Sequence, residues 1–247
     1  MCSMPFTQYF LNLDTNIFKI LSESTVFDDI IKGRKGAILL DNANDLIPIV
    51  RTTSSYTLPA QKFNEIHHSI INKIKEVMLD VEFNNAMIEI YNCDYKTMKY
   101  HSDQSLDLEA DSFICLFSCY SNSQTTNLRK LKIKEKGSKI ENEIILKHNS
   151  IVMFSTNTNK KYVQKIVLES HSKDDTLWLG LTLRKSKTLI KFIDEIPYFE
   201  NNTILRIGND DERREFMKMK GMENQLGDFT YPDIDFTIGP SDLMKVL

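Results

Sequence analysis

The stretch Thr176-Leu-Trp-Leu-Gly-Leu-Thr-Leu-Arg184 decides the fold, because two kinds of side chain alternate along it almost perfectly. Successive side chains of a β-strand point to opposite faces, so its leucines share one face and suit a core. The other face carries Trp178, Gly180, Thr182 and Arg184. An arginine at the end of an inward-facing row can bind a carboxylate through two parallel hydrogen bonds. The alternative is a strand that ends in a solvated arginine.

Short β-prone runs precede this strand, and turn-forming residues separate them. Many short strands with regular turn signals are typical of a sandwich or jelly roll. The expected strands are Met87–Asn92, Phe113–Tyr120, Leu128–Lys134, Lys139–Lys147, Ser150–Ser155 and Lys161–Leu168.

Two helices and a tail complete the expected architecture. The apolar spacing predicts a helix over about 59–79, with Pro59 in its first turn, and a short helix within 14–32. The tail contains a helical stretch near Glu212–Lys220, and 228–243 is expected to be an extended strap over the surface. We therefore predict an α+β fold: a main domain over 1–190, and a C-terminal extension over 191–247 that packs on it.

Composition limits the classes of protein that this chain can belong to. The formal charge is −3 and the pI is near 6, so the sequence lacks the basic excess of a strong duplex-binding protein. No apolar run approaches 18 residues, and Met1 to Asp14 does not resemble a signal peptide. We expect no membrane span and an intracellular protein, cytoplasmic or nuclear. No feature predicts the oligomeric state.

The four cysteines form no CxxC pair and no zinc-binding spacing. Cys115 and Cys119 lie four residues apart in one expected strand, where their Cα atoms would be roughly 13 Å apart. A disulfide requires about 7 Å or less. We therefore expect reduced, mostly buried thiols.

A second motif, Tyr100-His101-Ser102-Asp103, has the spacing of a metal site. Residues at i and i+2 of an extended chain project to the same face, so the imidazole and the carboxylate can converge on one metal ion. Chance produces H-x-D often, so this motif is informative only together with the strand that ends at Arg184.

Over roughly residues 45–188 the sequence resembles the AlkB-like 2-oxoglutarate/Fe(II)-dependent oxygenases. The resemblance rests on Pro48-Ile-Val-Arg-Thr-Thr53, Ile90-Tyr91-Asn92, His101-Ser-Asp-Gln-Ser-Leu106 and Leu181-Thr-Leu-Arg184. It implies a double-stranded β-helix, 2-oxoglutarate as small-molecule co-substrate, and Fe(II) held by two histidines and one carboxylate. It also implies that Arg184 pairs with the distal carboxylate of 2-oxoglutarate, with Thr182, Tyr91 and Asn92 as further co-substrate contacts. Trp178 and Gly180 stand where the family usually has arginine and asparagine.

The second histidine ligand that the family requires is missing, and Gln164 stands at its expected position. If the chain turned near residue 172 as a hairpin, Gln164 would lie opposite Gly180, which would leave room for the metal. His171 and His148 are the alternative ligands, although one would lie at the hairpin tip and the other begins a different strand. Glutamine offers a neutral carbonyl oxygen, a poorer Fe(II) ligand than imidazole.

Three functions are consistent with these residues. The first is an oxygenase with His101, Asp103 and Gln164 as the metal ligands and no other catalytic residue. The second is a jelly-roll binding module that has lost one iron ligand, and the third is an interaction role carried by the tail. For the oxygenase, the resemblance implies methylated nucleic acid as the leading substrate class, and Tyr56 could form a stacking lid over a flipped base. A basic stripe could also run along one strand, although an exposed strand face explains these lysines equally: Lys130, Lys132, Lys134 and Lys136.

Overall fold

The largest element of the fold is an eight-stranded sheet, which we call the main sheet. A computed structural model describes residues 5–13, 16–41, 45–169 and 175–247. The strand order is β1-β10-β7-β12-β6-β3-β2, and β5 pairs with β3 in addition. The bounds are β1 (Thr7–Phe10), β2 (Asp28–Ile31), β3 (Arg34–Leu40), β5 (Gln61–Lys62), β6 (Asn85–Tyr91), β7 (Phe113–Tyr120), β10 (Ser150–Ser155) and β12 (Trp178–Arg184).

A smaller sheet faces the main sheet and closes the barrel. It has the order β11-β8-β9, with β8 (Lys130–Glu135), β9 (Asn142–Ile145) and β11 (Tyr162–Val167). Thr97 and His101 extend this sheet through single bridges to β11. From β7 to β12 the chain passes back and forth between the sheets: β7 lies in the main sheet, β8 and β9 in the smaller one, β10 in the main sheet, β11 in the smaller one and β12 in the main sheet. This path is a double-stranded β-helix, as the sequence predicts.

The expected pairing of residues 164 and 180 in a hairpin is wrong. β11 pairs with β8, so Gln164 lies beside Ile133. β12 lies between β6 and β7 instead, with Gly180 opposite both Glu89 and Ser118. The two strands therefore belong to facing sheets and meet across the barrel interior.

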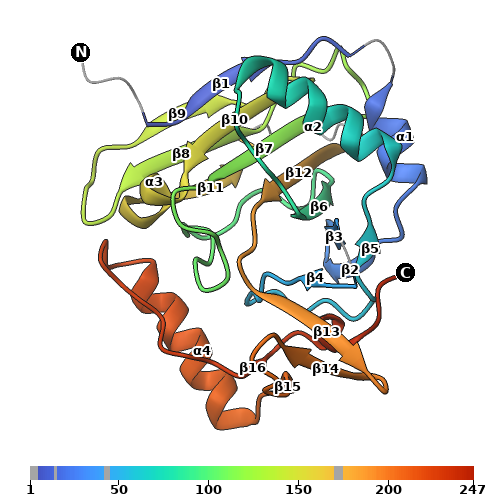
Figure 1. Ribbon diagram of the computed structural model, residues 1–247. Coiled ribbons are helices and arrows are strands. Elements are labelled where there is room, and N and C mark those ends of the chain that lie inside the picture. The colour runs from blue at the N-terminus through green and yellow to red at the C-terminus, as the bar shows by residue number, and fades with distance from the viewer. Residues whose placement is uncertain (1–4, 14–15, 42–44, 170–174) are drawn as a thin grey trace.

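Two helices, α1 (Ile17–Glu23) and α2 (Glu65–Val77), contribute apolar side chains to a core shared with the main sheet. In the ribbon they lie on one side of that sheet (Figure 1). The start expected at Pro59 is wrong, because Asn64 caps α2 and residues 61–62 form β5. His67 is buried, and its Nδ1 accepts the backbone N–H of Asn64 at 3.0 Å. This histidine is structural.

The C-terminal part of the chain lies together at one end of the barrel (Figure 1). It contains β13 (Leu189–Ile193), β14 (Ile196–Phe199), β15 (Arg206–Ile207), α4 (Asp210–Glu223), β16 (Phe236–Thr237) and the 3₁₀ helix η1 (Pro240–Leu243). β13 pairs with β4 (Ile47–Pro48), so the chain before and after residue 190 shares one small sheet. The boundary at 190 stays a prediction. A short helix, α3 (Thr156–Lys161), joins β10 to β11.

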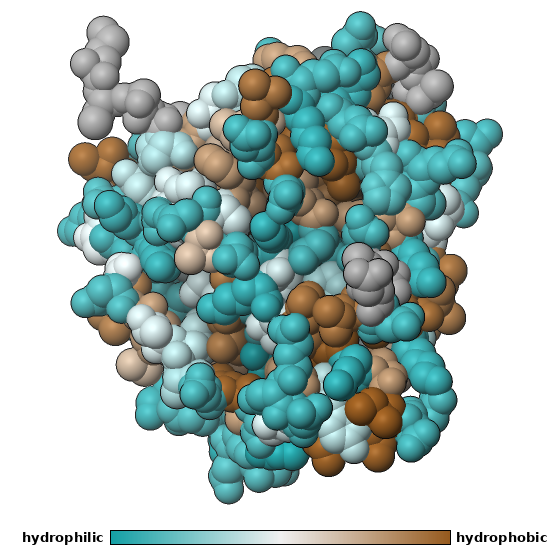
Figure 2. Space-filling view, viewed as in Figure 1, coloured by the Kyte–Doolittle hydropathy of each residue, from teal (hydrophilic) through white to brown (hydrophobic). Residues whose placement is uncertain are grey.

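The face of the molecule that is drawn in Figure 2 is mainly hydrophilic. Figure 2 shows one face, on which apolar residues gather in several separate patches. Within the described ranges, no helix has both the length and the apolar character that a membrane crossing needs. Cys115 and Cys119 are free and fully buried in β7, as expected for reduced thiols, and burial raises the pKa of both.

Candidate metal centre

The predicted ligands meet where the smaller sheet reaches the edge of the barrel. His101 and Gln164 form an antiparallel bridge, in which the His101 N–H donates to the Gln164 carbonyl at 3.0 Å and the Gln164 N–H donates back at 2.7 Å. Asp103 follows two residues later, and its Oδ1 accepts a hydrogen bond from Gln164 Nε2 at 3.1 Å. The structure therefore brings the three residues together, although the hairpin argument for Gln164 is wrong.

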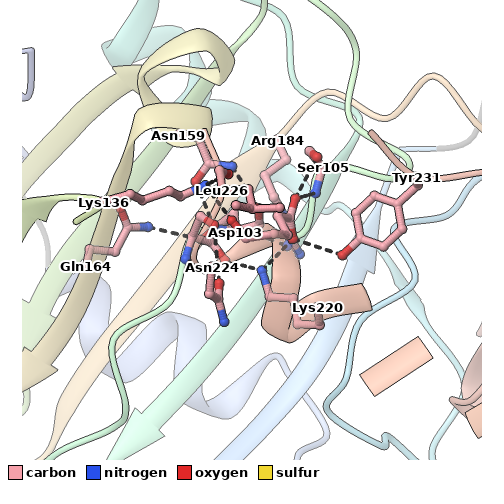
Figure 3. Close-up of polar contacts among 12 residues, drawn as sticks. Asp103, Ser105, Lys136, Asn159, Gln164, Arg184, Lys220, Asn224, Leu226 and Tyr231 are labelled. Atoms are coloured by element: carbon pink, nitrogen blue, oxygen red, sulfur yellow. Dashed lines mark hydrogen bonds and ion pairs between the residues drawn. The ribbon is translucent and has the colours of Figure 1, made fainter. Parts of the chain in front are cut away.

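Arg184 reaches the same point from the opposite sheet. Its Nη1 lies 3.8 Å from Asp103 Oδ2 (Figure 3), and its Nη2 lies 3.4 Å from Asn85 Oδ1. Three buried polar atoms in this group have no hydrogen-bond partner: Asp103 Oδ2, Gln164 Oε1 and Arg184 Nε. Because each unsatisfied buried polar group costs free energy, such a cluster is typical of a place where water, an ion or a ligand binds.

The imidazole of His101 is oriented as a metal ligand requires. Its Nδ1 lies 3.0 Å from the Lys99 carbonyl oxygen. Because a carbonyl can only accept, Nδ1 carries the proton and Nε2 keeps a free lone pair. Burial lowers the pKa of His101, an effect that the Asp103 charge partly offsets, so the ring is held neutral.

A cavity of about 50 Å³ extends from these residues into the barrel. Its polar lining includes Thr182 and Tyr91, both on the expected inward face. Asn92 is not among the lining residues, since its Oδ1 accepts the Asp94 N–H in a turn at 2.9 Å. The apolar walls are Met87, Met98, Ile114, Leu116, Leu131, Phe154 and Ile166.

The inner end of this cavity holds an ion pair that the sequence reasoning missed. Glu89 lines the cavity, and its carboxylate accepts hydrogen bonds from Arg34 Nε at 2.6 Å and from the Tyr91 hydroxyl at 2.5 Å. Glu89 precedes Tyr91 by two residues in β6, so strand alternation alone places both on the inward face. Glu89 lies opposite Gly180 of β12, which is four residues, or roughly 13 Å along the strand, from Arg184.

The Trp178 ring fills the space that Gly180 was expected to leave for a metal, so that expectation is wrong. A Cβ at residue 180 would lie 2.2 Å from the ring of Trp178. The guanidinium of Arg129 lies 5.9 Å from the centre of the same ring. The large side chain at residue 178 thus occupies the space that the absent side chain at residue 180 leaves open.

Of the two alternative ligands, the structure describes only His148. His148 accepts the Tyr120 N–H at 3.1 Å, a structural role. His171 lies outside the described residues. Within those residues, no cluster of three or more His, Cys, Asp and Glu side chains could hold a metal ion.

The features expected to bind nucleic acid have other roles. Tyr56 is buried against β3, so it is not a lid. Lys130 and Lys132 share the Glu169 carboxylate at 2.8 and 2.7 Å. The remaining lysines of the stripe also have partners: Lys134 lies over the Tyr100 ring, and Lys136 donates to backbone carbonyls near the end of α4. The stripe is therefore not an open cationic surface.

The donor set fits a divalent metal ion, with one weak ligand. A neutral imidazole nitrogen and a carboxylate are good ligands for Fe(II), and the amide oxygen of Gln164 is a poorer one. The fit rests on the two orphaned oxygens, Asp103 Oδ2 and Gln164 Oε1, because a bound cation would satisfy both.

Comparison with known proteins adds little at the level of sequence, since no family model and no curated protein matches this chain. Among solved structures, a prolyl-4-hydroxylase from Pseudomonas putida is similar, with 11% identity and a TM-score of 0.42. The match covers 74% of this chain and 94% of the hydroxylase.

Proposed function

We propose that this chain is a non-haem oxygenase of the AlkB-like type, which binds Fe(II) through His101, Asp103 and Gln164 and uses 2-oxoglutarate as co-substrate. The observation that supports this proposal most directly is the convergence of these three side chains at the mouth of a barrel cavity. Among the described residues, two of their oxygens there have no hydrogen-bond partner, and one of these, Asp103 Oδ2, has only the 3.8 Å ion pair with Arg184. Most buried polar atoms in proteins are hydrogen-bonded, so a group of unsatisfied atoms beside a cavity supports ligand binding there.

Each side chain has a separate task in this proposal. His101 offers Nε2 because Lys99 holds the proton on Nδ1. Arg184 supplies a buried positive charge beside Asp103, where a carboxylate of the co-substrate can replace the long 3.8 Å contact. The apolar walls exclude water from the reacting atoms. When bound, Fe(II) and 2-oxoglutarate supply the capacity to oxidise a C–H bond with O₂, releasing succinate and carbon dioxide.

The test compares the parent with Gln164→His and with the isosteric control Asp103→Asn. Binding of Fe(II) and 2-oxoglutarate is measured anaerobically by calorimetry, and succinate release is then followed in air. We expect weak metal binding in the parent, binding tighter by on the order of tenfold in Gln164→His, and none in Asp103→Asn. Absence of metal binding in both the parent and Gln164→His would contradict the proposal.

A second candidate function is a non-catalytic binding module on the same barrel. It is favoured by Glu89, whose carboxylate lies at the inner end of the cavity. The positive charge of Arg34 is already paired with this carboxylate and is therefore not available to an acidic ligand. An acidic co-substrate would meet this charge. Turnover by Gln164→His together with none by the parent would favour the module over the oxygenase.

The proposal does not extend to a nucleic-acid substrate. Two lysines on β8, Lys130 and Lys132, are paired with Glu141, Glu143 and Glu169, so most of the positive charge of this strand is neutralised and is not available to phosphate. The substrate screen should therefore include proteins and small molecules beside methylated oligonucleotides.

A further inference from the structure

The backbone that carries the two metal-binding side chains is held from three directions. β11 holds His101 through the paired backbone bonds with Gln164. α3 holds Asp103, because Asn159 Oδ1 accepts its N–H at 2.8 Å and Asn159 Nδ2 donates to its carbonyl at 2.7 Å. The residue between them, Ser102, is held by neither.

Ser102 is held by the C-terminal end of α4. Asn224 Oδ1 accepts the Ser102 N–H at 3.0 Å, and the Lys220 ammonium donates to the Ser102 carbonyl. Lys220 and Asn224 lie one helical turn apart, on the side of α4 that faces the motif (Figure 3). Both backbone groups of Ser102 are therefore satisfied by side chains that lie more than a hundred residues later in the chain.

A buried carboxylate, that of Glu223, connects the same helix end to Ser105, which lies two residues after Asp103. Glu223 Oε1 accepts the Ser105 N–H at 2.8 Å and its hydroxyl at 2.6 Å. Its Oε2 accepts from Lys220 at 2.7 Å and from the Tyr231 hydroxyl at 2.9 Å. Glu223 is 3% exposed, and burying an ionised pair is favourable only when its hydrogen bonds are satisfied. The C-terminal segment therefore does more than cover the barrel surface, because its side chains hydrogen-bond the backbone of Ser102 and Ser105.

We propose that Lys220, Glu223 and Asn224 are positioning residues, and that the C-terminal segment is a working part of the metal centre. They act by fixing the backbone of 102–105, which sets the directions of the His101 and Asp103 side chains. This inference rests on the proposed function, because it assumes that these two side chains bind a metal. Partners that orient metal ligands typically change metal affinity by about 10- to 100-fold when they are removed.

The test uses the full-length chain with Asn224→Ala, which removes the acceptor for Ser102, and Asn224→Asp, which keeps it. Glu215→Ala is the matched control on the exposed face of α4. Ile74→Val, in the core beneath α2, serves as a control for general loss of stability. The readouts are amide hydrogen exchange of residues 101–105 without metal, and affinity for Co(II) measured from its absorption spectrum.

We expect Asn224→Ala to speed exchange at Ser102 and to weaken Co(II) binding by about tenfold. Asn224→Asp, Glu215→Ala and Ile74→Val should leave both readouts near those of the parent. Any of three results would overturn the proposed positioning role: unchanged amide exchange at Ser102 in Asn224→Ala, the same effect in Ile74→Val, or unchanged Co(II) affinity in Asn224→Ala.

Failure of the proposed function gives a different result. In that case neither the parent nor Gln164→His binds Co(II) at all. The exchange measurement then tests the positioning of the 102–105 backbone by itself. Faster exchange at Ser102 in Asn224→Ala alone supports this positioning role, and unchanged exchange overturns it.

Discussion

The two ends of the barrel cavity each hold a carboxylate and an arginine, but they differ in how completely the pair is formed. At the inner end, Arg34 lies 2.5 Å from Glu89 and Tyr91 adds a hydrogen bond. At the mouth, Arg184 lies 3.8 Å from Asp103, and three nearby polar atoms have no partner. The inner pair contributes to stability, whereas the mouth pair leaves capacity for a ligand. Burial is similar at both ends, so burial alone does not distinguish a structural pair from a functional one.

The largest expected effect comes from removing one partner at each end. Arg34→Met leaves Glu89 as an unpaired buried charge, and we expect it to lower the free energy of unfolding by about 3–5 kcal/mol. Arg184→Met breaks two long contacts, the 3.8 Å ion pair with Asp103 and the 3.4 Å hydrogen bond to Asn85, and the expected loss is about 1 kcal/mol. Urea denaturation at pH 7 measures both. Equal losses would show that the two ends are built alike.

The partly buried carboxyl group of Asp242 in η1 sharpens the comparison, because no ion pair with another described residue holds it. Burial raises its pKa to about 7, the Asp107 charge adds to this, and Thr237 and Arg51 oppose it. Between about pH 4 and pH 7 the unfolded chain is ionised at this residue while the folded chain is protonated. The free energy of unfolding therefore falls as pH rises through this window, by on the order of 4 kcal/mol in total.

The variant Asp242→Asn tests this effect, because its amide oxygen still accepts from Thr237. We expect its stability to change less than that of the parent between pH 4.5 and 7.5, and to exceed it at the upper limit. Parallel stability curves for the two proteins would show that Asp242 is ionised in the folded state, as an ion-paired carboxylate would be.

The smallest expected effect concerns co-substrate binding. Glu89→Gln removes the negative charge at the inner end and keeps acceptors for Arg34 and Tyr91. We expect affinity for 2-oxoglutarate to rise roughly three- to tenfold, equivalent to about 1 kcal/mol. Titration with 2-oxoglutarate in the presence of Co(II) measures this change, with Met87→Leu as an uncharged control in the same wall. An unchanged affinity would place both carboxylates of the ligand at the mouth.

Strand alternation predicted much of the barrel. β7 and β10 have the expected bounds, and the inward face of β12 carries the four residues assigned to it. Alternation is a local property, so one strand suffices to read it. Which strands pair is not local, and the hairpin between residues 164 and 180 is wrong because the chain changes sheet at that connection. The same alternation, applied to β6, would have found Glu89.

The contacts of the C-terminal segment lay beyond this reasoning for a different reason. α4 is strongly polar along its length, so its pattern does not single out Lys220 or Asn224. Lysine is rarely buried. A sequence gives no sign that the Ser102 carbonyl, 118 residues earlier, will accept a hydrogen bond from Lys220. Such partners become visible only when the barrel and the tail are seen together.

The contact between Trp178 and Gly180 provides a built-in optical probe. Trp178 is the single tryptophan of the chain, and it is 2% exposed within the barrel. Tryptophan fluorescence, excited at a wavelength that tyrosine does not absorb, therefore monitors the barrel interior alone. Comparing tryptophan emission with far-ultraviolet circular dichroism during heating would reveal whether the segment that holds Ser102 detaches before the barrel melts.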